Sequence, residues 1–235
     1  MRLYFLDTVR GIAIILMIFF HIFVTINLFN SNKYNLNSTP LQQIGIISRN
    51  ILILLFGISL YLSYVNSNNI IEYKKKQIKR IILLLICSII ITITTYIFIP
   101  NEYIVFGILH FFAISGFILY NFVNNIPILL FIFLFVSIFN MVFYDTSLQS
   151  YFIGMFVPFY KNTIDHFFIF KYINVIIIGI FIAHILYNSY KKSKINNKYN
   201  TYLDNSIINK IGKNSLLIYM IHIPILYYIV YTYYK

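Results

Sequence analysis

Residues Phe5–Phe29 read FLDTVRGIAIILMIFFHIFVTINLF and are the clearest indication of the fold class. It is an almost unbroken apolar run, longer than the roughly 20 residues that a helix needs to cross a bilayer. The run has no small-residue cleavage site and is too long for the apolar core of a secretion signal. We therefore expect Phe5–Phe29 to be a membrane-spanning helix.

The composition extends this expectation to the whole chain. Of its 235 residues, 60% are hydrophobic and only 10% are charged, and the mean hydropathy is +0.80. A soluble domain could not cover its surface with so few charges, and intrinsic disorder requires low hydrophobicity. The single Cys87 excludes a disulfide scaffold. The sequence predicts an all-α, multi-pass protein of the cell membrane that forms a single domain over residues 1–235.

Seven segments are long and apolar enough to span a bilayer. Pro100 closes the third segment, and Pro127 suits the first turn of the fifth. The apolar run Tyr151–Tyr160 is too short to span, which indicates an interfacial or re-entrant piece. The seven predicted spans are Phe5–Phe29, Leu41–Val65, Ile81–Ile99, Tyr103–Phe122, Ile126–Tyr144, Phe167–Tyr190 and Asn214–Tyr233.

The positive charges follow the predicted topology. The chain carries 18 Lys and Arg against 6 Asp and Glu, a net charge of +12. Most of the cations lie in two links, after the second and the sixth span, so the positive-inside rule puts the N-terminus in the cytoplasm and the C-terminus outside. A nucleic-acid partner is therefore not expected, and an anionic-lipid or nucleotide site is the alternative. The cations of the two links are Lys74, Lys75, Lys76, Lys79, Arg80, Lys191, Lys192, Lys194, Lys198, Lys210 and Lys213.

The first span carries polar side chains that a bilayer tolerates poorly, which makes them candidates for function. Asp7 and Arg10 are three residues apart and can pair on one face. Arg10 and His21 are separated by about three helical turns and so share a stripe. Gly11 beside them permits close approach of another helix. A simple helix-end ion pair is the alternative for Asp7 and Arg10. The stripe also holds Ile14, Met17 and Thr25.

The predicted topology also gives the depth of the other polar residues. At 1.5 Å per residue, His21, Arg49 and His110 fall in one band in the outer half of the membrane. The same arithmetic puts His184 and His222 nearer the cytoplasm. An outer and an inner cluster suit a reaction whose reagents arrive from both membrane faces.

These histidines also have less specific alternative roles. Each intramembrane histidine could instead form an interhelical hydrogen bond, which is the role we favour for His184. His166, beside Asp165, is typical of an ordinary interfacial residue. The histidines lack metal-ligand spacing, and the chain has no Gly-rich phosphate loop or nucleophile elbow. No metal site is expected.

Four short phrases occur in order along the chain. They are LDTVRGIAIILM at Leu6–Met17, FGISL at Phe56–Leu60, FGILH at Phe106–His110 and NSLLIYMIH at Asn214–His222. Together they resemble the first, second, fourth and closing helices of the catalytic domain of heparan-alpha-glucosaminide N-acetyltransferase and its short microbial relatives. The spacing from Arg10 to His21 also resembles the wider membrane acyltransferase superfamily that O-acylates polysaccharides.

The resemblance implies an integral-membrane acyltransferase. Acetyl-CoA would be the cosubstrate, and a glycan or amino sugar across the bilayer would accept the acyl group. A histidine, His21 or His110, would act as acyl acceptor or general base. The animal enzyme has Asn where His21 stands and Gln where His110 stands. The residues implied for substrate or CoA binding are Asp7, Arg10, Arg49, Asn214 and His222.

The sequence is also compatible with two other functions. O-acylation of a cell-envelope polysaccharide would use the same donor, and a transporter or non-catalytic membrane protein would use none. The transporter is disfavoured because the chain shows no internal repeat and no single midplane polar cluster. A homo-oligomer is left open by the sequence.

Overall fold

The computed structural model describes residues 4–30, 34–36, 39–100, 103–142, 165–192 and 206–234, and these form helices joined by short connections. Within these residues the only β-structure is one isolated bridge, between Phe106 and His166. The prediction of an all-α fold is confirmed. The helices are α1 (Tyr4–Phe29), α2 (Thr39–Val65), α3 (Ile70–Phe98), α4 (Ile108–Leu119), α5 (Ile126–Val142), α7 (Ile169–Lys192), α9 (Ile207–Lys213) and α10 (Ser215–Tyr234).

Five of these helices are long and apolar enough to cross a membrane: α1, α2, α3, α7 and α10. They confirm five of the seven predicted spans. Helices α4 and α5 are apolar but have only 12 and 17 residues, so the count of seven and the sides of the termini stay predictions. The predicted interfacial run Tyr151–Tyr160 lies outside the described residues.

Helix α3 begins at Ile70, well before the predicted Ile81. The Asn69 side chain caps the helix by accepting a hydrogen bond from the Glu72 amide at 2.8 Å, and Glu72 pairs with Lys76 at 2.6 Å. Lysine and glutamine are good helix formers, and neither Gly nor Pro interrupts this stretch. The cation cluster from Lys74 to Arg80 therefore lies on the first turns of a helix and not in a loop.

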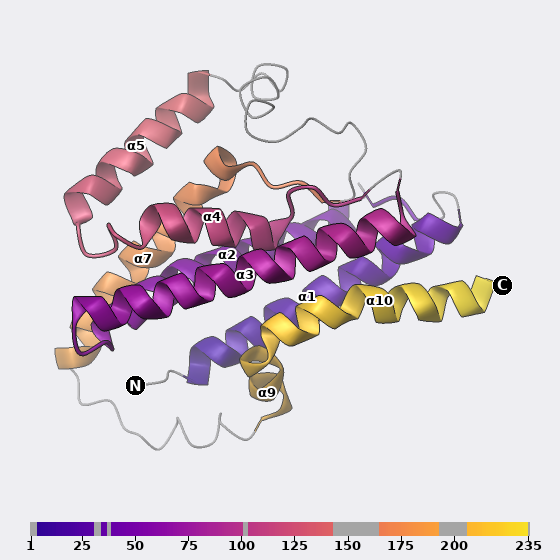
Figure 1. Cartoon of the computed structure of the whole chain (residues 1–235), viewed down its shortest axis with the longest axis horizontal. Helices are drawn as coiled ribbons and strands as arrows, with labels where there is room; N and C mark the ends of the chain where they lie inside the picture. The colour runs from indigo at the N-terminus through magenta and orange to yellow at the C-terminus, as the bar shows by residue number, and fades with distance from the viewer. Residues whose placement is uncertain are drawn as a thin grey trace. The chain divides into compact units, whose positions relative to one another are not determined.

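The chain folds into two compact units. The first combines the two ends of the sequence, Met1–Leu55 and Ser189–Lys235, and the second holds Phe56–Asn188. In the first unit α1 packs against α9 and α10 (Figure 1). The Phe29 ring lies 4.9 Å from Tyr227, and His21 lies beside His222, so contacts advance together along both helices. Helices α1 and α10 are thus parallel, as the topology predicts for the first and last spans.

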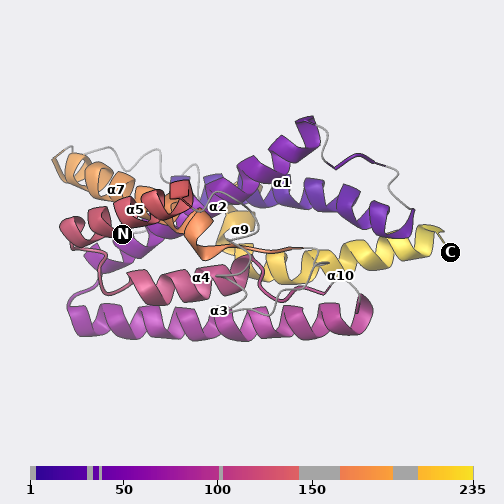
Figure 2. The same ribbon diagram turned by 90° about the horizontal axis from the view of Figure 1, so that it is seen from above.

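In the second unit α3 and α4 lie side by side and antiparallel (Figures 1 and 2). The Tyr73 hydroxyl donates to the Tyr120 carbonyl at 3.1 Å, just after α4 ends. At the other end of α3, the Thr92 hydroxyl donates to the Ile104 carbonyl at 2.8 Å, just before α4 begins. These two bonds fix the register of the helix pair.

Candidate functional site

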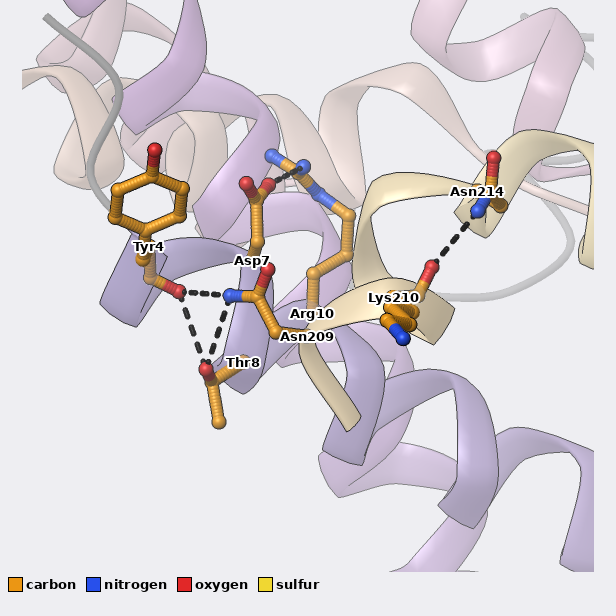
Figure 3. Close-up of polar contacts among 7 residues, drawn as sticks. All are labelled: Tyr4, Asp7, Thr8, Arg10, Asn209, Lys210 and Asn214. Atoms are coloured by element: carbon orange, nitrogen blue, oxygen red, sulfur yellow. Dashed lines mark hydrogen bonds and ion pairs between the residues drawn. The ribbon is translucent and has the colours of Figure 1, made fainter. Parts of the chain in front are cut away.

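The polar stripe predicted on α1 is present. Asp7, Gly11, Ile14, Met17 and Thr25 are buried on one side of the helix. Arg10 donates from Nη1 to Asp7 Oδ1 at 2.9 Å, which confirms the predicted pair (Figure 3). The Asp7 side chain is 6% exposed and that of Arg10 is 23% exposed, so Asp7 is buried and Arg10 is partly exposed.

The neighbour that Gly11 was expected to admit is the short helix α9. A Cβ atom on Gly11 would overlap the Ile208 carbonyl, and one on Gly212 would overlap the Asp7 carbonyl. The two backbones therefore touch at a pair of glycines, as small residues allow between membrane helices. In the predicted topology this segment belongs to the link before the last span. The structure shows that it is a helix packed on the first turns of α1.

Asn209 ties α9 to the start of α1. Its side chain is fully buried, and its Nδ2 donates to the Tyr4 carbonyl at 2.7 Å and to the Thr8 hydroxyl at 3.3 Å (Figure 3). Asn209 is not among the residues predicted from the sequence. Two residues could have indicated a short helix here. Ser206 is the N-cap, whose hydroxyl accepts from the Asn209 amide, and Gly212 follows Asn209 by one turn.

Two histidines meet between α1 and α10. His222 Nε2 lies 3.3 Å from His21 Nδ1, and the ring centroids are 5.0 Å apart. On its other side, His222 Nδ1 lies 2.6 Å from the Tyr219 carbonyl, one turn earlier in α10. His222 is 5% exposed, whereas His21 is only partly buried.

This contact corrects the predicted depth of His222. The prediction of an inner band for His222, apart from His21, is wrong because the two rings are in contact. The depth estimate holds only if the first and the last span start at the same level in the membrane. Helix α9 covers the first turns of α1, so α10 begins farther along α1 and brings its eighth residue level with His21.

The hydrogen bonds define how protons are arranged in the histidine pair. A carbonyl only accepts, so His222 Nδ1 donates to Tyr219 and carries a hydrogen. With His222 neutral, its Nε2 accepts from His21 Nδ1. In this arrangement His21 Nε2 keeps its lone pair and can accept a proton. A second proton on the pair would be shared across the 3.3 Å contact.

A family match covers nearly the whole chain, including the residues of this site. Residues 2–224 match the family described as "Heparan-alpha-glucosaminide N-acetyltransferase, catalytic". The chain belongs to this family. The match includes the four phrases on which the resemblance was based, and it makes the chain a member of a membrane acyltransferase family. No curated protein and no solved structure matches the chain.

The other candidate residues of this acetyltransferase-family chain lie on α2, α4, α7 and at the end of α9. Arg49 lies on α2 in the first unit, and His110 lies on α4 in the second. Asn214 ends α9, where its Nδ2 donates to the Lys210 carbonyl at 2.9 Å (Figure 3). The grouping of His21, Arg49 and His110 at one depth stays a prediction. His184 packs against the Tyr61 ring at 5.3 Å.

Proposed function

We propose that this acetyltransferase-family protein of the cell membrane transfers an acyl group from acyl-CoA to an amino sugar or glycan on the other side of the bilayer. The observation that carries the proposal is the pair formed by His21 and His222 on facing helices. Family membership supports the acyl donor and the sugar acceptor.

His21 is the proton acceptor in this proposal. The acceptor amine attacks the thioester carbonyl carbon, the carbon–sulfur bond breaks, and the CoA thiolate leaves. His21 Nε2 takes the proton that the amine loses, and this proton passes to the thiolate. His222 holds the His21 ring through Nδ1 and shares the positive charge while the proton is held. The alternative role for His21 is acyl acceptor, in which its Nε2 attacks the thioester first.

The Asp7–Arg10 pair supports binding of the CoA phosphates at the predicted cytoplasmic end. The buried Asp7 carboxylate fixes one edge of the guanidinium, and the Arg10 side chain remains partly exposed. A positioned guanidinium is well suited to a phosphate. Lys213 on α9 lies over the Tyr4 ring at 4.9 Å and adds positive charge to the same end of the unit.

The deciding experiment measures acetyl-CoA consumption by the purified full chain in nanodiscs, with glucosamine and a panel of glycans as acceptors. We expect an N-acetylated product from the wild type and a kcat lower by about 10²- to 10⁴-fold in His21→Ala. His184→Ala is the matched control, because His184 packs on Tyr61 in the other unit.

Three outcomes would contradict parts of the proposal. Undiminished turnover in His21→Ala would remove this residue from the mechanism. An O-acetylated product would favour acylation of cell-envelope polysaccharide. Uptake of sugar into vesicles without consumption of CoA would favour a transporter.

A further inference from the structure

The first turns of α3 carry an exposed cationic face. The four lysines Lys74, Lys75, Lys76 and Lys79 are all exposed. Lys76 pairs with Glu72 at 2.6 Å, one turn earlier in the helix. Within the part of the chain that the structure describes, the other three lysines form no ion pair. The start of α3 therefore presents more positive charge than its own carboxylate can balance.

The other face of this segment is fixed to the rest of the second unit. Tyr73 is 1% exposed and is held by its hydrogen bond at the end of α4. Gln77 is 2% exposed, and its Nε2 donates to the Ser63 hydroxyl of α2 at 2.7 Å. The Arg80 guanidinium lies 4.6 Å from the centre of the buried Phe56 ring, so this cation packs on the core. The exposed lysines thus stand on a backbone that is held in place.

Two of the exposed lysines continue into an apolar stripe. Lys75 and Lys79 are one helical turn apart. Ile82 follows Lys75 by seven residues and Ile86 follows Lys79 by seven, which is close to two turns, and Ile90 lies one turn farther. The three isoleucines are 50%, 51% and 47% exposed. We call these five residues the exposed stripe of α3.

The exposed stripe has the length of a lipid in one leaflet. From Lys79 to Ile90 the helix rises about 16 Å, which is about half of a hydrocarbon core of about 30 Å. Lys75 and Lys79 repel each other across one turn, and a phosphate group between them would remove this repulsion. Lys74 and Lys76 each lie about 100° from Lys75 around the helix, so they flank the stripe and are not part of it.

We propose that the exposed stripe of α3 is a binding site for one anionic phospholipid. Lys75 and Lys79 hold the phosphate and the headgroup, and the three isoleucines contact an acyl chain. The charge favours an anionic lipid, because a zwitterionic lipid brings a further cation to a site that already has two. The positive-inside rule depends on how many cations a link carries and not on the helix face that they occupy. The site therefore goes beyond topology, and it does not depend on the proposed function.

The test is native mass spectrometry of the purified full chain in detergent. The chain is titrated separately with phosphatidylglycerol and phosphatidylcholine that have the same acyl chains, and the spectra give the dissociation constant of the first bound lipid. We expect the wild type to bind phosphatidylglycerol at least about tenfold more tightly than phosphatidylcholine, because two lysines face a headgroup of net negative charge.

Two double variants with the same loss of charge assign this preference to the stripe. Lys75→Gln with Lys79→Gln should bind the two lipids with affinities within about twofold of each other, because the headgroup loses both of its cations. Lys74→Gln with Lys76→Gln is the matched control. It removes two charges from the same turns but from the flanks of the stripe, so it should keep most of the preference.

Equal affinities for the two lipids in the wild type would overturn the proposal, and this comparison needs no variant to fold. An equal loss of preference in both double variants would reduce the site to a non-specific cationic surface. Displacement of phosphatidylglycerol by millimolar glycerol 3-phosphate or acetyl-CoA would show that the lysines bind a soluble phosphate ester instead. A dimer that binds neither lipid would assign the stripe to a second copy of the chain.

Discussion

Replacing Gly212 by alanine tests the contact between α1 and α9. The added methyl group would overlap the Asp7 carbonyl and approach the Gly11 amide nitrogen to 2.9 Å. Both of these are backbone atoms of α1, so no side chain can rotate away. Helix α9 must move outward, and Asn209 then loses its bonds to Tyr4 and Thr8.

The magnitude follows from three contributions. Overpacking costs about 1–3 kcal/mol, and two lost hydrogen bonds cost about 1 kcal/mol each. The higher helix propensity of alanine relative to glycine offsets about 1 kcal/mol of this cost. We therefore expect Gly212→Ala to lower the free energy of unfolding by about 2–4 kcal/mol. For a chain of this size the thermal midpoint should fall by roughly 4–16 °C.

The assay is thermal unfolding in detergent micelles followed by far-ultraviolet circular dichroism. Gly45→Ala is the matched control in the same unit, because the nearest atoms to its Cβ belong to the Phe20 ring at 3.3 Å. A side-chain ring can shift slightly, so this control should change the free energy by less than about 1 kcal/mol. Equal midpoints for the two variants would show that α9 does not pack on α1 as described.

Three further predictions concern the site and the topology. His222→Asn should lower kcat about 10- to 100-fold with little change in the KM for acetyl-CoA, because the His21 ring loses its support; steady-state kinetics measure this, and an unchanged kcat would contradict the pair. Asp7→Asn should raise the KM for acetyl-CoA several-fold, since Arg10 is no longer held by a charge; an unchanged KM would separate the pair from CoA binding. In a Cys87→Ser background, a membrane-impermeant thiol reagent added to intact cells should label Tyr234→Cys but not Lys75→Cys; the reverse pattern would invert the topology.

The features of α1 that could be predicted from sequence are local ones. The pairing of Asp7 with Arg10 and the burial of Gly11 depend only on the 3.6-residue period of one helix. The same periodicity predicts that His21 shares their stripe. The parallel course of the first and last spans follows from counting apolar segments.

The features that were missed depend on contacts between distant segments. A window that seeks long apolar runs passes over α9, which has seven residues, two of them lysines. The depth of His222 could not be estimated without α9, since that helix sets where α10 begins. The start of α3 was missed for a similar reason, because charged residues that favour a helix look like a link in a hydropathy profile.

The union of the two chain ends in the first unit has a consequence for biosynthesis. His21 and His222 are separated by 201 residues, and Asn209 is separated by 205 residues from Tyr4 and by 201 from Thr8. During translation α1 enters the bilayer while α9 and α10 are still unmade. The polar stripe of α1 therefore has no contacts with α9 and α10 until every intervening helix has been inserted. Premature termination before Asn209 would leave this stripe uncovered in lipid, so truncated chains should be preferred substrates for membrane quality control.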